Sequence, residues 1–244
     1  MKYFNVDKFN KLAEEKHLDY INASPFSHAV FYDLFDNDVL TKIYNEFPVM
    51  EEIMKNESGK AVRKKLSFFQ PDKLKFFEPI TKEFCLELNS PEFCMFLEKL
   101  TGINNIQSDP YFEGGGPHSI QNGGFLKMHV DFNVHPISFL DRRINVLVYL
   151  NDNWPDEYGG NLDLWDTEMG SLKKSISPKK NTTVIFNTTE NSWHGHPDPM
   201  TCPEDRYRRS LAFYYYTKPI VVKERHSTIY KPRNEKDFKV KKRK

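Results

Sequence analysis

Short runs of alternating side chains, separated by turn residues, constrain the fold of this chain most strongly. Within residues 143–150, Ile144, Val146, Val148 and Leu150 alternate with other side chains, so a strand would place these four on one face. Further β-branched or aromatic runs follow at 161–165, 172–176, 182–186 and 208–216. Short strands at this spacing predict an antiparallel sandwich or barrel. No strand–helix alternation supports a doubly wound parallel sheet.

The first part of the chain has a different pattern of apolar residues and is predicted to be mostly helical. Apolar residues recur at helical spacing over 39–47, 74–88 and 92–100. We expect Pro48 to end the first of these helices and Gly102 to cap the last. The polar stretch 51–65 is expected to be a loop. The helices would then cover one face of the sheet.

The length of the chain indicates its domain organisation, and its cysteine content indicates the cellular compartment. A chain of 244 residues is long enough for one globular domain with a full core. We divide it into a helical region at 1–102, a β core at 103–217 and a basic tail at 218–244. Three cysteines without a Cys-x-x-Cys pair argue against a disulfide framework or a thiolate zinc site, and favour a reducing compartment. We therefore expect a cytoplasmic protein.

Charge and hydropathy limit the partners. The net charge of +1 offers no general attraction for nucleic acid or an anionic membrane. The longest apolar run, 144–150, is too short to span a bilayer. The tail at 218–244 carries eleven basic and three acidic residues and ends in the basic run 239–244. We interpret it as a solvated terminus, with an arm that docks RNA as the alternative.

One segment combines metal-ligand side chains at strand spacing. His129 and Asp131 are two positions apart, so a strand presents both on one face. A third ligand must come from elsewhere, and both His194 and His196 follow the strand predicted at 182–186. Two histidines and one carboxylate on a triangular face leave coordination positions open, as in non-haem Fe(II) oxygenases. A structural zinc site would instead be closed by four protein ligands. The sequence therefore predicts an open metal site.

The strand predicted at 208–216 supplies a candidate anion site. One face begins with Arg208 and continues with Ser210 and Ala212, small residues that leave room for a ligand beside the guanidinium. A guanidinium binds a carboxylate bidentately, and a buried arginine is costly without such a partner. An organic acid is therefore the expected ligand. Tyr149 is expected to add a phenolic hydrogen bond to the same acid.

In this order, these residues resemble the iron- and 2-oxoglutarate-dependent dioxygenases, most closely the prolyl 4-hydroxylase-like branch. The resemblance rests on His129-x-Asp131, a later histidine, and an arginine before an aromatic strand. It extends to the segment 142–151, Trp154, Gly159-Gly160, Leu162-Asp163-Leu164 and Phe186. It covers residues 123–217, and the helical first part is similar in texture only.

The resemblance implies a mainly β fold with flanking helices, built on a double-stranded β-helix of the jelly-roll or cupin-like kind. It implies Fe(II) held by His129, Asp131 and His194. It also implies that 2-oxoglutarate binds the iron and pairs its far carboxylate with Arg208 and Tyr149. O2 would be the co-substrate, and ascorbate is the expected reductant.

The implied reaction is hydroxylation of a C–H bond, coupled to oxidative decarboxylation of 2-oxoglutarate to succinate and CO2. The presence of Asp131 favours hydroxylation over halogenation, because related halogenases lack the carboxylate ligand. The expected substrate is a prolyl residue in a peptide or protein. The same chemistry on an amino acid, a sugar or a nucleotide is the alternative, and a non-catalytic, metal-binding cupin-like module is another.

The resemblance also ranks competing residues. It favours His194 over His196 as the distal ligand, because the family places this histidine directly after an aromatic residue. It favours Arg208 over Arg209 and Arg206, and Arg209 would fall on the packing face.

Two further residues are candidates for a wall of the cofactor pocket. Asn145 lies on the same side of its strand as Tyr149, and His118 begins a segment that faces the pocket in the family. For each, an ordinary strand residue without a ligand contact is the alternative.

Overall fold

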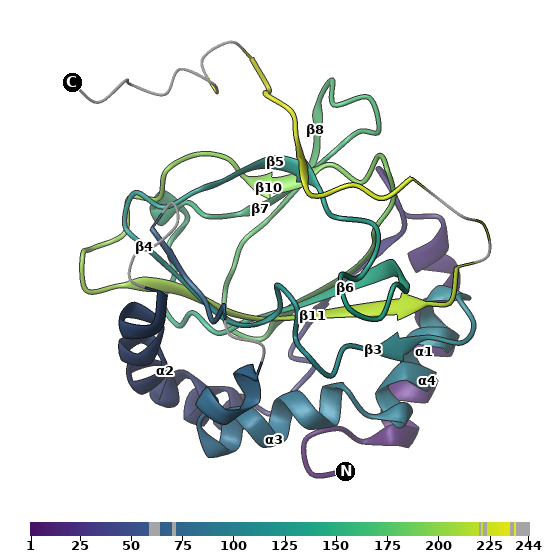
Figure 1. Cartoon of the computed structure of the whole chain (residues 1–244), viewed down its shortest axis with the longest axis horizontal. Coiled ribbons are helices and arrows are strands. Elements are labelled where there is room, and N and C mark those ends of the chain that lie inside the picture. Colours follow the sequence, from purple (N-terminus) through teal and green to yellow (C-terminus); the bar gives the residue numbers. More distant parts are fainter. Residues whose placement is uncertain (59–63, 70–71, 220, 222–223, 235–236, 238–244) are drawn as a thin grey trace.

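Two antiparallel sheets form the centre of the computed structural model, as the alternating runs predict (Figure 1). The structure describes residues 1–58, 64–69, 72–219, 221, 224–234 and 237. The larger sheet contains β1 (His28–Tyr32), β2 (Lys65–Leu66), β3 (Gln107–Ser108), β4 (Gly116–Gln121), β6 (Asp141–Tyr149), β9 (Thr182–Asn187) and β11 (Tyr207–Thr217). The smaller sheet contains β5 (Leu126–Val130), β7 (Leu162–Trp165), β8 (Leu172–Ile176), β10 (His194–His196) and β12 (Ile229–Tyr230).

The order of the strands defines the fold class. The larger sheet runs β1-β9-β6-β11-β4-β2, and the smaller runs β12-β5-β10-β7-β8. From β4 to β11 the chain passes back and forth between the two sheets, which is the winding of a double-stranded β-helix. The predicted fold class is therefore confirmed, as are the five strands predicted from the sequence.

The two faces of β6 explain why its sequence alternates. Ile144, Val146 and Val148 pack into the main hydrophobic core, together with apolar side chains of the helices. Tyr149 belongs to a second cluster, which lies between the two sheets. The larger sheet thus buries both faces. One packs against the helices and the other lines the interior of the β-helix.

In the part of the chain that the structure describes, four helices cover the outer face of the larger sheet (Figure 1). They are α1 (Val6–Ile21), α2 (Asn37–Ser58), α3 (Pro79–Leu88) and α4 (Pro91–Thr101), and two short 3-10 helices lie at Lys73–Phe76 and Asp156–Tyr158. Ser90 caps the start of α4 through a hydrogen bond to the amide of Phe93, and Gly102 ends that helix in the left-handed conformation. The predicted cap at Gly102 is confirmed.

The prediction that Pro48 ends a helix is wrong, because α2 continues through this residue to Ser58. Proline has no N–H to donate to the carbonyl of Tyr44, one turn earlier. The structure supplies another donor, since Arg209 Nη1 lies 3.4 Å from that carbonyl oxygen. The same guanidinium binds both carboxylate oxygens of Glu51, at 2.8 and 2.9 Å. This buried ion pair holds the second half of α2 against the sheet.

The loop predicted at 51–65 is therefore also wrong over its first eight residues, which are helical. Residues 59–63 lie outside the described part of the chain. Lys65 then begins β2, which pairs with β4 at the edge of the larger sheet. Together with β1, this strand shows that the region 1–102 contributes to the β-sheet as well as to the helical layer.

The middle of the segment 218–244 is mostly exposed, as expected of a solvated tail, but part of it is attached to the smaller sheet. Strand β12 pairs with β5, with Tyr230 opposite His129 and their rings 5.6 Å apart. Arg233 then binds Asp198 through two hydrogen bonds, at 2.7 and 3.0 Å. The predicted basic run 239–244 lies outside the described residues. Among the helices that the structure describes, none is both long enough and apolar enough to cross a bilayer.

Candidate active site

The smaller sheet brings the three predicted metal ligands together. His129 lies on β5, Asp131 follows directly after that strand, and His194 begins β10. Because β5 and β10 are paired with His194 opposite His129, the two imidazole rings lie 4.3 Å apart. One ligand atom from each of the three residues lies within 4.8 Å of the others. Of the described residues, no other group of this kind can hold a metal ion.

Backbone carbonyls orient both imidazoles. His129 Nδ1 lies 2.8 Å from the carbonyl oxygen of Lys127, and His194 Nδ1 lies 2.8 Å from that of Ser192. A carbonyl only accepts, so each Nδ1 carries the proton and each Nε2 keeps its lone pair. Burial, with a contribution from His129, lowers the pKa of His194 to about 4. The Nε2 atoms of His129 and His194 lie 3.6 and 3.5 Å from carboxylate oxygens of Asp131, and this set of donor atoms fits a divalent metal.

The carboxylate ligand is held by two side chains from β6. Asp131 Oδ2 accepts a hydrogen bond from Asn145 Nδ2 at 2.8 Å and lies 3.1 Å from Arg142 Nη2. Burial alone would raise the pKa of Asp131, but Arg142 and the two imidazoles outweigh it and hold the pKa well below its usual range. Asp131 is therefore ionised, and its Oδ1 lies 3.6 Å from His129 Nε2.

Arg142 is a site residue that was not predicted from the sequence. Its guanidinium lies between the rings of Phe132 and Tyr214, 4.4 and 3.6 Å from their centroids, and it donates to Asn145 Oδ1. Stacked and hydrogen-bonded, it is a rigid positive support for Asp131. The motif 142–151 contains it, but only the folded strand shows that it turns toward the metal ligands.

A cavity of about 70 Å³ extends from the triad between the two sheets. Its wall includes the predicted residues His118, Asn145, Tyr149 and Arg208, as well as the three ligands. Arg208 Nη2 donates to Tyr149 Oη at 3.1 Å, and Arg208 Nε donates to the carbonyl of Gly160 at 2.7 Å. The structure thus brings together the metal triad and the proposed carboxylate clamp in one interior space.

The remaining predicted residues have distinct positions. Asn145 lines the cavity, but its amide binds Asp131 and Arg142, which makes it a support for the metal ligand. His118 also lines the cavity and donates from Nε2 to the carbonyl of Gly114 at 2.9 Å. Arg209 lies on the opposite face of β11 in its ion pair with Glu51, as the strand alternation predicts.

Lys65 and His196 also line this cavity, although the sequence alone predicted neither on its wall. Burial lowers the pKa of Lys65 to about 8, and the positive charge of Arg208 adds to the effect. His196 is buried, and neither of its ring nitrogens has a hydrogen-bond partner among the described residues. Lys65 could not be found locally, because it comes from a stretch whose composition indicates a loop.

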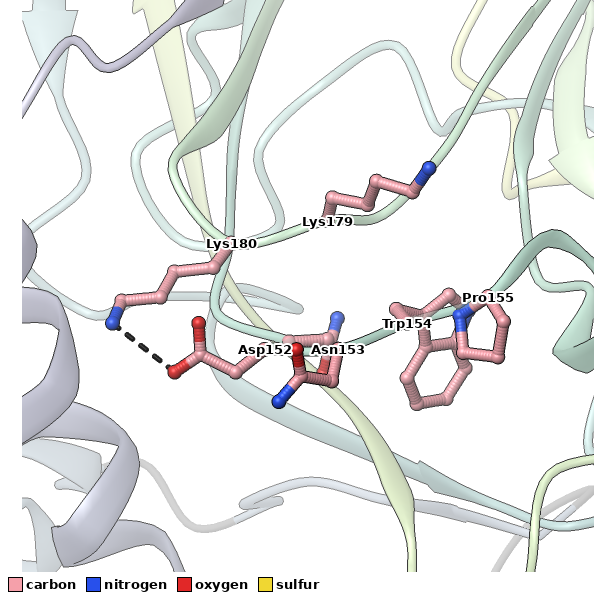
Figure 2. A pocket seen from close by; sticks show the side chains of 7 residues that line it. Asp152, Asn153, Trp154, Pro155, Lys179 and Lys180 are labelled. Carbon is pink, nitrogen blue, oxygen red and sulfur yellow. Dashed lines mark hydrogen bonds and ion pairs between the residues drawn. The ribbon is translucent and has the colours of Figure 1, made fainter.

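A separate hollow of about 540 Å³ shares no lining residue with the cavity at the triad. Figure 2 shows its side chains, which come from residues 151–155 and from Lys179 and Lys180. The charge of Lys180 is balanced by Asp152, whose carboxylate lies 3.1 Å away. This hollow lacks a metal-ligand group, so the chemistry is expected at the triad.

The comparison with protein families identifies the segment that carries this geometry. The model described as the 2OG-Fe(II) oxygenase superfamily matches residues 116–216, from the start of β4 nearly to the end of β11. His129, Asp131, His194 and Arg208 all lie inside the matched segment. The resemblance predicted from the sequence is therefore confirmed for this superfamily. No curated protein matches the chain significantly.

Solved structures show the same fold. A prolyl hydroxylase of Trichoplax adhaerens, in complex with a hypoxia inducible factor oxygen degradation domain peptide fragment, gives a TM-score of 0.59 at 16% identity, with 86% of this chain and 91% of that chain covered. A prolyl 4-hydroxylase structure from Phytophthora capsici gives 0.57 at 15%, with 87% of this chain and 65% of that chain covered. HygX of Streptomyces hygroscopicus, with nickel and 2-oxoglutarate bound, gives 0.54 at 13%, with 82% and 86% covered.

Proposed function

We propose that this chain is an Fe(II)- and 2-oxoglutarate-dependent dioxygenase that hydroxylates a C–H bond. The observation that carries the proposal is the triad of His129, Asp131 and His194, which opens onto a cavity with Arg208 on its wall. When bound, the iron and 2-oxoglutarate would supply O2 activation, with succinate and CO2 as products. The donor set fits ferrous iron, because three ligands on one face leave positions open for 2-oxoglutarate and O2.

The chain's own residues have separate tasks in this reaction. The two imidazoles and Asp131 would hold the metal, and Arg142 and Asn145 keep Asp131 ionised and oriented. Arg208 and the hydroxyl of Tyr149 are aligned to bind the far carboxylate of 2-oxoglutarate. Burial raises the pKa of Tyr149, so its phenol stays protonated as a hydrogen-bond donor.

We propose a peptidyl substrate, with a prolyl residue as the first choice. The inner cavity of about 70 Å³ would be filled by 2-oxoglutarate, so the substrate must approach from outside. An open cleft of about 420 Å³ lies at Asp131 and Phe132 and continues along Arg143 and Thr188. A cleft at the surface admits one residue of a larger molecule. The Trichoplax adhaerens neighbour is bound to a peptide fragment, which supports this choice.

The proposed compartment is the cytoplasm, and ascorbate is the proposed reductant that keeps the iron ferrous. Among the described residues all three cysteines are free and buried, which fits a reducing environment.

The test is turnover with Fe(II), 2-oxoglutarate and ascorbate, measured as succinate release and as gain of one oxygen atom by mass spectrometry. Proline-containing peptides are compared with free proline, other amino acids, sugars and nucleotides. We expect peptides to stimulate succinate release and to gain oxygen, and His129→Ala to abolish both. Stimulation by small molecules alone would contradict the peptidyl substrate. Absence of succinate with every compound would contradict the oxygenase.

A further inference from the structure

Three nitrogen-bearing side chains face the inner cavity from different strands. Arg208 comes from β11, Lys65 from β2 and His196 from β10. Arg208 and Lys65 lie on either side of Ile120, which is the register partner of both. Because partners in a sheet project to the same side, both cations enter the space between the sheets. Lys65 lies outside the segment 116–216 that matches the superfamily model.

These cations lack an anion. Among the described residues, no carboxylate forms an ion pair with Arg208 or Lys65. The other charged groups that act on Lys65 are Asp131, Lys73 and Arg142, and the single acid among them is already bound by Arg142. Two positive groups beside a buried space repel each other unless a negative ligand joins them. Burial and Arg208 lower the pKa of Lys65 to about 8, which agrees with this unbalanced charge.

The imidazole of His196 lacks a partner as well. Its exposed fraction is 4%, and both ring nitrogens are buried without a hydrogen bond in the described structure. Such an orphaned group costs free energy, and it is rare unless a ligand satisfies it. The carbonyls that fix His129 and His194 have no counterpart at His196. Its ring is therefore available to a ligand in the cavity.

We propose that Lys65 and His196 complete, with Arg208, the site for the far carboxylate of 2-oxoglutarate. This inference rests on the proposed function. The Lys65 ammonium would supply a second positive charge, and His196 an N–H donor, to carboxylate oxygens that accept several hydrogen bonds. The N-terminal region thereby takes part in the choice of cosubstrate. A 2-oxo acid without the far carboxylate gains nothing from either residue.

The test uses binding, measured by titration calorimetry on protein loaded with zinc, which cannot turn over. The ligands are 2-oxoglutarate and 2-oxopentanoate, which has the same chain length without the far carboxylate. We expect Lys65→Met to weaken 2-oxoglutarate binding at least about 10-fold, and His196→Phe about 3-fold. Neither change should affect 2-oxopentanoate. Lys64→Met is the matched control, because this neighbouring lysine is exposed.

The outcomes separate the inference from the function on which it rests. If wild type binds 2-oxoglutarate and Arg208→Met weakens it, but Lys65→Met and His196→Phe bind normally, the inference is overturned and the proposed function stands. If zinc-loaded wild type does not bind 2-oxoglutarate, both are overturned. Equal losses for both ligands in Lys65→Met would also overturn the inference, because they indicate a general disturbance of the pocket. Zinc content, measured for each variant, shows that the triad is intact.

Discussion

A single added methyl group at Gly160 tests how firmly the fold holds Arg208. Gly160 has a φ of +76°, and a Cβ built there would lie 2.9 Å from Arg208 Cδ and 2.7 Å from Met200 Sδ. Its neighbour Gly159 has a φ of +69°, but a Cβ there meets nothing within 4 Å. Both alanine variants therefore carry a penalty for a positive φ, and only Gly160→Ala adds a contact with the clamp.

The magnitude follows from these distances. Alanine at either glycine costs about 1–3 kcal/mol of backbone strain. Non-bonded carbon atoms prefer a separation of roughly 3.5–4.0 Å. In Gly160→Ala the aliphatic part of the Arg208 side chain must therefore move by more than about half an ångström. This shift breaks its 2.7 Å hydrogen bond to the Gly160 carbonyl and displaces the guanidinium. Loss of one hydrogen bond between a charged group and its ligand costs about 1.5–3 kcal/mol of binding free energy. This corresponds to a roughly 10- to 150-fold loss of affinity for 2-oxoglutarate.

The assay is calorimetric titration of 2-oxoglutarate into zinc-loaded protein, with urea unfolding of the same samples. We expect both alanine variants to be less stable and Gly160→Ala alone to bind 2-oxoglutarate at least about 10-fold more weakly. Equal affinities for folded Gly160→Ala and Gly159→Ala would refute the reasoning, because the clamp would then not depend on this turn.

Three other perturbations have directions that follow from the structure. Glu51→Gln should lower the free energy of unfolding by about 3–5 kcal/mol in urea, because it leaves the buried Arg209 charge unpaired; exposed Glu52→Gln should change it little, and equal effects would contradict this. Affinity for 2-oxoglutarate should fall as the pH rises through about 8, because Lys65 then loses the charge that attracts the carboxylate. A calorimetric pH series should show this fall in wild type, and the fall should be absent in Lys65→Met. Asn145→Leu should weaken metal binding about 10- to 100-fold in a competition titration, because Asp131 loses an orienting donor; unchanged affinity would show that Arg142 suffices.

Local patterns predicted those parts of the molecule that depend on spacing within one strand. The alternation in residues 143–150 predicted both the face of β6 that packs on the helices and the face that carries Asn145 and Tyr149. The two-residue spacing of His129 and Asp131 placed both at one end of a strand in the same way. Such predictions need no knowledge of the neighbouring elements, because the side-chain direction of a strand is a local property.

Features that depend on distant partners could not be predicted from the sequence. Pro48 lies inside a continuous helix, and Arg209, far along the chain, donates to the carbonyl that the proline leaves free. Lys65 belongs to the cavity only because a two-residue strand pairs with β4. Tyr230 reaches His129 because β12 adds to the edge of the smaller sheet. In each case tertiary pairing overrides the local composition, and one sequence contains no sign of the partner.

The choice between His194 and His196 shows which site residues a sequence motif can and cannot predict. Both histidines lie on β10, and the register with β5 is irregular between them. His194 lies opposite His129 and joins the triad, whereas His196 lies opposite Leu126 and lines the cavity. The resemblance ranked the two residues as the structure places them. It gave no task to His196, whose unpaired ring becomes visible only in the folded cavity.

The most direct test of the account is 2-oxoglutarate binding to the anaerobic Fe(II) protein, followed by its visible charge-transfer absorption. We predict a band in wild type that is absent in His129→Ala and that needs far more 2-oxoglutarate in Arg208→Ala. This result would establish that the metal and the carboxylate clamp act on one ligand. Iron-loaded wild type that shows no band at saturating 2-oxoglutarate would contradict the central claim.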